Sequence, residues 1–183
     1  MRLVRAADLV RTPWKNGGGT TAEIAAHPPG SDLDGFDWRL SMADVASDGP
    51  FSVFPGIDRT LTLIDGPGLD LVIDGEPHRL KPDHPICVFP GEAAAIARLT
   101  GGPIRDFNVM TRRSRFRHQV AMTQPGRHQE VGALLAVDGP TSVRAQARRL
   151  MLERFDTLLI GPRPGTIEAD GRLLIVRVEP YVG

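Results

Sequence analysis

The sequence is poor in cysteine, in aromatic residues and in excess charge of either sign. Cys87 is its one cysteine in 183 residues, so no disulfide can form within the chain. The 22 basic residues balance the 22 acidic ones, which disfavours a nucleic-acid or membrane-surface partner, because such partners normally require a basic excess. No apolar run approaches the roughly 20 residues of a membrane-spanning helix, and residues 1–8 lack the apolar segment of a signal peptide. We therefore expect a cytoplasmic protein.

Glycine and proline, by contrast, are plentiful and are scattered singly along the chain. The 20 glycines and 16 prolines suit many short strands joined by tight turns. Between them, short segments alternate apolar and polar residues, and the dipeptide Asp74-Gly75 is typical of a tight hairpin. This patterning predicts an all-β fold, as a sandwich or a barrel. In the first part of the chain the predicted strands are residues 21–26, 36–43, 59–64, 69–73, 86–89, 95–99 and 104–110.

The second part of the chain repeats this rhythm less clearly. Residues 142–155 fit an Arg-rich amphipathic helix as well as strands, and we prefer strands because Val143, Ala145 and Ala147 keep a two-residue period. No linker is visible. We expect two similar β units, residues 1–112 and residues 113–183, with a solvated basic seam near residues 112–117 and strands that can be exchanged between the units. The other strands predicted here are residues 116–122, 133–137, 158–160 and 173–178.

Five segments of the chain carry a recognisable pattern. They read PWKNGGGTT (residues 13–21), WRLSMA (38–43), GPFS (49–52), FPGIDR (54–59) and DFNVMTRR (106–113). In these segments and in their order the chain resembles the HutD/Ves family, and the resemblance covers nearly its whole length.

The resemblance implies both a fold and a role. The implied fold is a bicupin-like arrangement of two cupin-type (RmlC-like) barrels, with the ligand pocket in the first unit and a more degenerate second unit. The implied role is that of a non-catalytic modulator of histidine utilisation, which senses a carboxylate such as urocanate or a formyl- or formimino-glutamate. Because cupin sheets often pair edge to edge, the resemblance also allows a homodimer.

The histidines that a cupin metal centre needs are missing from the expected positions. Cupin enzymes commonly hold a metal with a His-x-His pair, a carboxylate and a later histidine. Here the strand that would carry the pair has Arg59 and Leu61, and the turn at residues 89–91 is followed by Glu-Ala-Ala-Ala. His78 and His84 lie in a Pro-rich, loop-like stretch. We expect no metal and no other cofactor, and solvated or edge positions for His27, His78, His84, His118 and His128.

Arg59 is the leading candidate for ligand binding. It shares a strand face with Leu61 and Leu63, which points it into the barrel or at its rim, where an unpaired charge costs about 3–5 kcal/mol. It therefore needs a carboxylate from the protein or from a ligand. Asp106, which shares a face with Asn108 on a later strand, is the candidate internal partner. Two alternatives stay open: an Arg59–Asp106 pair that closes the barrel mouth, or recognition of a carboxylate ligand.

The segment from Trp14 to Gly19 is the second candidate. Consecutive glycines let the backbone approach a ligand and present N–H donors. Because Trp14, Lys15 and Asn16 stand just before Gly18, we favour a place at the pocket rim over a flexible turn.

The strand at residues 36–43 has two distinct faces. Trp38, Leu40 and Met42 are expected in the core, and Arg39 and Ser41 on the opposite face. Both faces of a barrel strand can contribute to a site, so Ser41 joins the candidates. The expected ligand-binding residues are Arg59, Lys15, Asn16, Trp14, Asp106, Asn108, Ser41 and Gly18.

Three functional hypotheses follow from these residues. The favoured one is a metal-independent protein that binds a small carboxylate metabolite and has no catalytic residues. The alternative is a metal-free isomerase or hydrolase acting on a small organic acid, with Asp106 as general acid or base. Cys87, in an apolar strand, is expected to be inert. The third is a purely structural homodimer.

Overall fold

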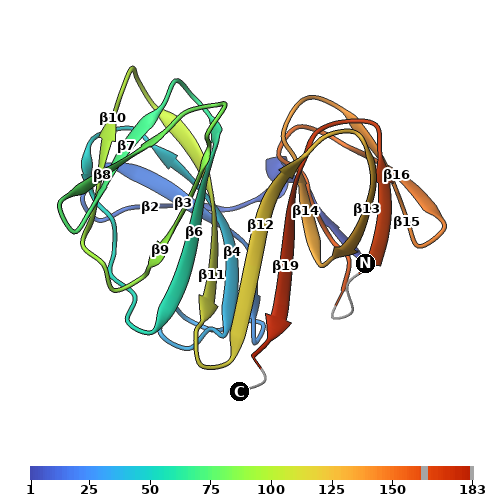
Figure 1. The fold of residues 1–183 in the computed structure, drawn as a ribbon, viewed down its shortest axis with the longest axis horizontal. Helices are drawn as coiled ribbons and strands as arrows, with labels where there is room; N and C mark the ends of the chain where they lie inside the picture. Colours follow the sequence, from blue (N-terminus) through green and yellow to red (C-terminus); the bar gives the residue numbers. More distant parts are fainter. Residues whose placement is uncertain (162–164, 182–183) are drawn as a thin grey trace. The chain divides into compact units, whose positions relative to one another are not determined.

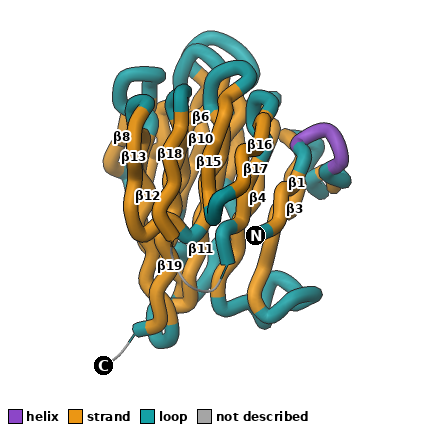
Figure 2. Tube along the Cα trace, turned by 90° about the vertical axis from the view of Figure 1, so that its right-hand side faces the viewer, coloured by secondary structure: helices purple, strands orange, loops and turns teal. Residues whose placement is uncertain are grey.

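A computed structural model describes residues 1–161 and 165–181 of the chain (Figure 1). These residues form strands throughout and contain no α-helix; one short 3-10 helix, Ala6–Asp8, is purple in Figure 2. The predicted all-β class is confirmed. Within the described ranges, no helix has the length and hydropathy that a membrane span requires.

The N-terminal unit comprises Val10–Arg117 with a short piece from Pro180 onward, and it contains two antiparallel sheets. The six-stranded sheet has the order β2 (Arg11–Pro13), β3 (Gly19–His27), β4 (Trp38–Val45), β11 (Ile104–Arg112), β6 (Ile57–Asp65) and β9 (Ile86–Pro90). The four-stranded sheet has the order β5 (Gly49–Pro50), β10 (Ala95–Leu99), β7 (Leu69–Ile73) and β8 (Glu76–Leu80).

One apolar core is shared by the two sheets of this unit. Each fully buried leucine in such a core contributes about 1.5–3 kcal/mol. The six-stranded sheet supplies Ala43, Val45, Leu61, Leu63, Cys87, Phe89 and Ile104, and the four-stranded sheet supplies Leu69, Leu71, Ile73, Leu80, Ala95 and Ala97. The face of the six-stranded sheet that carries Leu61 and Leu63 is therefore the inner face of the unit.

The C-terminal unit comprises Met1–Leu9 and His118–Glu179 and also contains two sheets. The first has the order β1 (Arg2–Val4), β17 (Thr157–Leu159), β14 (Ala133–Ala136), β19 (Leu173–Pro180) and β12 (Phe116–Thr123). The second has the order β13 (Gly126–Val131), β18 (Gly165–Ala169), β15 (Thr141–Ala145) and β16 (Arg148–Leu152). Its core includes Val131, Leu134, Val143, Leu152, Leu158 and Ile167.

Most of the segment at residues 142–155 belongs to a β-hairpin, residues 141–152, as preferred from its two-residue period. Strands β15 and β16, both drawn as strands in Figure 2, are joined at Gln146 and Ala147, which have φ of 47° and 62°. Two successive left-handed residues suit a tight hairpin and end any helix. Val143 and Ala145 are buried, whereas Arg144 between them is exposed.

Strands β7 and β10 have the bounds that the sequence predicts. The loop-like stretch expected around His78 is instead the edge strand β8, and His78 is exposed there, which agrees with the solvated or edge position predicted for it. The turn that joins β7 to β8 has positive φ at both Asp74 (48°) and Gly75 (91°), as a two-residue hairpin requires. Four of the five residues of β8 are exposed, so this edge strand has no apolar alternation that could reveal it.

Asp156 ties the first residues of the chain to the C-terminal unit. Its buried carboxylate accepts hydrogen bonds from Ala6 N at 2.9 Å, from Glu153 N at 2.8 Å and from Arg5 Nη1 at 2.6 Å. Strand β1 pairs with β17 directly beside this contact. Charge-assisted bonds of this kind are about twice as strong as neutral ones, so they hold the N-terminal strand in a unit otherwise formed by residues far along the chain.

Replacing Asp156 with alanine should loosen that strand. The change leaves the N–H groups of Ala6 and Glu153 without their acceptor, and we expect a loss of about 2–4 kcal/mol in the free energy of unfolding. Hydrogen–deuterium exchange followed by mass spectrometry should then be faster in residues 2–8 than in the wild type. The control is Asp138→Ala, which removes an exposed ion pair with Arg172 worth under about 1 kcal/mol. Equal exchange of residues 2–8 in both variants would contradict this role of Asp156.

Candidate functional site

Polar side chains gather on the inner face of the N-terminal unit, where three strands of the six-stranded sheet meet. Strands β6, β11 and β4 pair in register, so that their inner-face residues form rows across the sheet. Because alternate residues of a strand point to the same face, the polar members of these rows lie among the leucines of the core. The rows are Arg59–Met110–Arg39, Leu61–Asn108–Ser41 and Leu63–Asp106–Ala43. We call Arg39, Ser41, Arg59, Asp106 and Asn108 the inner-face cluster.

Arg59 is almost completely removed from solvent. It is 2% exposed, as its alternation with Leu61 and Leu63 predicted. Its Nη1 donates a hydrogen bond to the backbone carbonyl of Ser52 at 3.1 Å, whereas Nε has no acceptor among the described residues. Burial lowers the pKa of Arg59 to about 10, an effect that the negative charge of Asp106 opposes and the positive charge of Arg39 reinforces. The guanidinium therefore stays charged at neutral pH.

Three phenylalanine rings surround this guanidinium. The distances from Arg59 Cζ to the ring centroids are 5.0 Å for Phe89, 5.4 Å for Phe54 and 5.6 Å for Phe51. Cation–π contacts of this kind contribute about 0.5–2 kcal/mol each, which offsets part of the desolvation cost. Because the rings contact the guanidinium without accepting conventional hydrogen bonds, N–H donors of Arg59 stay available to an acceptor.

The loop that carries two of these rings is fixed by backbone hydrogen bonds. Phe51 N donates to Ala95 O at 2.8 Å, and Phe54 N donates to Gly91 O at 2.7 Å. Gly91 has no room for a side chain, since a Cβ there would lie 2.6 Å from Phe54 O. The loop between β5 and β6 is thus held over Arg59 and supplies two of its three aromatic contacts and its one carbonyl contact.

Arg39 is the second buried cation of the cluster, and it is already paired. Its Nε donates to Glu23 Oε2 at 3.0 Å, and its Nη1 donates to Ser41 Oγ at 3.2 Å. A register shift in β3 between Glu23 and Ala25 marks a bulge at this partner, and bulges commonly redirect side chains beside sites. Arg59 is consequently the cation in this cluster that lacks a carboxylate partner among the described residues.

Asp106 and Asn108 are buried acceptors without donors. Asp106 is 0% exposed and Asn108 is 6% exposed. No group in the described part of the chain donates a hydrogen bond to either carboxylate oxygen of Asp106 or to the Oδ1 of Asn108. Burial raises the pKa of Asp106 to about 7; the positive charge of Arg59 opposes this rise and Asp44 adds to it.

The direct Arg59–Asp106 pair, which the sequence left open, is not formed. Asp106 lies opposite Leu63, four residues along β6 from Arg59, and four residues of strand span about 13 Å. The two groups interact through their fields but share no ion pair within the described residues. Of the two alternatives, the pair that closes the barrel mouth is therefore not formed, because the strand register keeps the two side chains apart.

Trp14 lies close to the inner face, as a rim residue would. Its Nε1 donates to Thr21 Oγ1 at 2.7 Å, its ring meets Phe51 edge-on at 6.0 Å, and it packs against the core of the unit. Phe51 in turn contacts Arg59. Trp14 is thus connected to the inner-face cluster through one aromatic ring.

The rest of the glycine segment forms a tight loop against β4. Lys15 and Asn16 are exposed, and Asn16 Oδ1 accepts from Gly18 N at 3.0 Å. The carbonyl of Gly18 accepts from the N–H groups of Ala46 and Ser47, and a Cβ at Gly19 would lie 2.3 Å from Asp44 O. The contacts of Asn16 and Gly18 are thus within the loop and with the end of β4, not with the inner-face cluster.

Sequence analysis missed Arg39 and the three phenylalanines as parts of the site. The alternation of β4 predicts Arg39 on the face opposite the core, because it places Leu40 and Met42 in the core. Both are buried, but Arg39 is too, at 9% exposure. Alternation cannot tell which face meets a site when a strand is covered on both sides.

The inner-face cluster does not fit a first-row metal ion. Such ions need several imidazole, thiolate or carboxylate ligands converging on one point, and no group of three or more such residues occurs in the part of the chain that the structure describes. The row Arg59–Met110–Arg39 instead presents two guanidinium groups, which are cations and do not ligate a metal ion.

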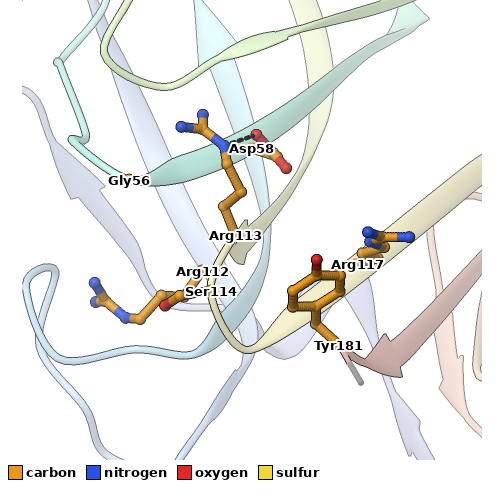
Figure 3. A pocket seen from close by; sticks show the side chains of 7 residues that line it. All are labelled: Gly56, Asp58, Arg112, Arg113, Ser114, Arg117 and Tyr181. Atoms are coloured by element: carbon orange, nitrogen blue, oxygen red, sulfur yellow. Dashed lines mark hydrogen bonds and ion pairs between the residues drawn. The ribbon is translucent and has the colours of Figure 1, made fainter. Parts of the chain in front are cut away.

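An open pocket of about 540 Å³ lies elsewhere in the N-terminal unit (Figure 3). Its cations are largely engaged: Arg113 contacts Asp58 at 2.7 Å and Glu92 at 2.8 Å, and Arg112 donates to the carbonyl of Phe36. This pocket coincides with the predicted basic seam, and its carboxylate-paired surface suits an anion less well than the inner-face cluster does. The lining residues are Gly56, Asp58, Arg112, Arg113, Ser114, Arg117 and Tyr181.

The buried carboxyl of Asp106 should make stability depend on pH. Its pKa of about 7 in the folded state exceeds the ordinary value near 3.9, so the unfolded chain ionises first. Stability should fall by about 1.4 kcal/mol per pH unit as pH rises from about 4 to about 7, and then level off. Urea unfolding at pH 5.0 and 7.5 should show this loss in the wild type and not in Asp106→Asn. Parallel pH profiles of the two proteins would contradict a buried, protonatable Asp106.

Several known proteins are similar to this chain in sequence. A protein from Pseudomonas putida, described as an uncharacterized 21.2 kDa protein in the hutC 3′ region, is 45% identical over 117 residues, covering 64% of this chain and 61% of that protein. Protein Ves from Cronobacter sakazakii is 47% identical over 109 residues, covering 58% of each chain. The matched part thus spans about three fifths of the length of these curated relatives.

Solved structures extend the likeness to the whole chain. HutD from Pseudomonas fluorescens SBW25, whose structure is described as a formate condition, is 32% identical with a TM-score of 0.83, and the match covers 99% of both chains. A cupin 2 conserved barrel domain protein from Leptotrichia buccalis, at 10% identity and a TM-score of 0.62, covers 97% of this chain and shares its fold. The family model described as HutD matches residues 6–175. The chain therefore belongs to the HutD family, as the resemblance of its motifs predicted.

Proposed function

We propose that this protein binds a small carboxylate metabolite through Arg59, without a metal, and acts as a non-catalytic sensor that modulates histidine utilisation. One observation carries the proposal: a guanidinium that is 2% exposed has no carboxylate partner among the described residues. A buried and unpaired charge is costly, and a carboxylate ligand would compensate it. Two parallel bonds from the fork would add about 1.5–3 kcal/mol and would fix the ligand's orientation.

The relatives support the choice of ligand class. The Pseudomonas putida relative is described as a protein of the hutC 3′ region, and the structure of HutD from Pseudomonas fluorescens is described as a formate condition. Formate is the smallest carboxylate. The family resemblance adds urocanate and the formyl- or formimino-glutamates as candidates, each of which ends in a carboxylate that Arg59 could receive.

The proposal includes a cupin-type architecture for the site. We propose that the two sheets of the N-terminal unit close into a barrel around the inner-face cluster, and that the two-sheet C-terminal unit is its degenerate counterpart in a bicupin. The paired sheets of each unit and the fold likeness to a cupin barrel protein support this arrangement. In such a barrel the aromatic loop over Arg59 would control entry of the ligand.

A metal-free enzyme is the second candidate, and one group favours it. Asp106 is buried beside the proposed site, and its pKa of about 7 is suited to a general acid or base near neutrality. Cys87 offers no nucleophile, because burial raises the pKa of its thiol. Turnover of formylglutamate or urocanate by purified, chelator-treated protein would favour this candidate over the sensor.

Replacing Arg59 with methionine should remove carboxylate binding and leave the protein folded. Methionine keeps much of the length of the side chain, and loss of an unpaired buried charge is often neutral or stabilising. Titration calorimetry with formate, urocanate and N-formylglutamate should identify at least one ligand of the wild type. The Kd of that ligand should rise roughly 10- to 150-fold in the variant, as expected when two parallel hydrogen bonds to a carboxylate are lost.

The control for this experiment is Arg79→Met, which removes an exposed arginine of the same unit that pairs with Asp70. Its affinity for the carboxylates should match that of the wild type. Circular dichroism melts of both variants check the fold. An Arg59→Met protein that melts normally and binds with unchanged affinity would remove Arg59 from the site.

A further inference from the structure

Four charged residues form one row across the four-stranded sheet of the C-terminal unit, whose strands are labelled in Figure 2. Taken from β16 through β15 and β18 to β13, the strand register aligns Arg149, Arg144, Glu168 and Arg127. All four residues are exposed, and the residues on either side of Arg144 and Glu168 are buried in the core of the unit. Because alternate residues of a strand point to opposite faces, the row lies on the outer face of the sheet.

Arg144 and Arg149 are direct cross-strand partners in this row. Side chains at such positions have Cβ atoms about 4.5–5.5 Å apart, and like charges placed there destabilise the strand pair. The carboxylate of Glu168 is 3.9 Å from Arg144 Nη1, but strand β15 separates Glu168 from Arg149. The two arginines therefore repel each other, and an anion bound between them would relieve that repulsion.

Arg149 is held in place by a hydroxyl group that can itself serve a ligand. Its Nε donates to Ser142 Oγ at 2.7 Å, which uses one of the five N–H donors of the guanidinium. A serine hydroxyl that accepts this bond still has its own hydrogen to donate. Ser142 is fixed in turn by Asp170, whose Oδ1 accepts from Ser142 N at 2.7 Å and whose N–H donates to Ser142 O at 3.2 Å. The Asp170 carboxylate is thus engaged with the backbone of β15.

These groups line an open pocket of about 210 Å³. Pockets for drug-sized ligands measure roughly 300–1,000 Å³, so this one suits a small group. The lining residues are Ser142, Arg144, Arg149, Glu168, Ala169 and Asp170.

We propose that this pocket is a second ligand site, which binds a phosphate group between Arg144 and Arg149, with the hydroxyl of Ser142 as a further donor. Guanidinium forks match phosphate oxygens with two parallel hydrogen bonds. A phosphate group carries about −1.5 to −2 charges near pH 7, which matches two guanidinium groups, whereas a carboxylate carries one charge. The site lies in the C-terminal unit and does not depend on carboxylate binding at Arg59.

Titrations with defined anions test the ligand class. Inorganic phosphate, glycerol 3-phosphate and acetate are added to the full chain at pH 7.5 and constant ionic strength, and the amide resonances of residues 142–150 are followed by NMR. Both phosphates should shift these resonances in a saturable manner, with a Kd at least tenfold lower than that of acetate. A lower Kd for glycerol 3-phosphate assigns the site to an ester, and a lower Kd for inorganic phosphate assigns it to the free ion. The absence of a saturable shift with either phosphate, or equal affinity for acetate, would overturn the proposal.

Variants of the row locate the site. Arg149→Gln and Arg144→Gln should each raise the Kd for phosphate at least fivefold, and Glu168→Gln should lower it about two- to fivefold, because a neighbouring negative charge is removed. The matched control is Arg148→Gln, which removes an exposed arginine next to Arg149 on β16 that points to the opposite side of the strand. This control should keep the Kd within about twofold of the wild type. Equal weakening by Arg148→Gln and Arg149→Gln would reveal a general attraction of anions to the hairpin and would contradict the site.

Urea unfolding gives a second and independent measurement. Without phosphate, Arg144→Gln should be at least as stable as the wild type, because the contact between like charges is removed. Phosphate should raise the urea midpoint of the wild type and of Arg148→Gln more than that of Arg144→Gln, since only a folded protein with the intact site gains stability from binding. Phosphate also strengthens apolar burial in every protein, so the difference between the variants is the measure. An equal rise in all three proteins would overturn the proposal.

Discussion

The structure of the N-terminal unit depends on one constraint, the presence of a charged guanidinium inside an apolar core. Arg59 is charged at neutral pH although it is 2% exposed. Three aromatic rings and one backbone carbonyl compensate part of the lost hydration. The loop that supplies the carbonyl and two of the rings is pinned by backbone hydrogen bonds, so the contacts of Arg59 are determined by the fold around it.

The strand register also keeps Arg59 and Asp106 from forming an ion pair. Arg39 lies in the same row as Arg59 but is paired with Glu23. Asp106 lies two rows away from Arg59, too far for an ion pair along a strand that rises about 3.3 Å per residue. Three arginines of this unit thus differ in their partners: Arg39 is paired with Glu23, Arg113 is paired with surface carboxylates, and Arg59 has no carboxylate partner among the described residues.

The sequence could predict the features that depend on the alternation within a single strand, but not those that depend on how strands pair. Strands β7 and β10 and the inward position of Arg59 follow from strict alternation between a polar and a buried face. Arg39 could not be placed, because β4 is covered on both faces and its alternation carries no direction. The absence of an Arg59–Asp106 contact depends on the pairing of β6 with β11, which is a relation between strands far apart in the sequence.

The glycine segment shows a different limit. Its composition suggested a ligand-binding rim, but Asn16 and Gly18 satisfy groups within the loop and at the end of β4, and only Trp14 extends to the aromatic rings around Arg59. Local composition could not separate close backbone packing from close approach of a ligand, since both require residues without a Cβ.

The most direct test of a carboxylate receptor at Arg59 is the NMR signal of its own Nε–H group. This N–H has no acceptor among the described residues, and its resonance can be assigned by its loss in Arg59→Met. Titration with formate should move the resonance downfield in a saturable manner and slow its exchange with solvent, as a new charge-assisted hydrogen bond forms. A resonance that stays in place while formate binds would contradict the account.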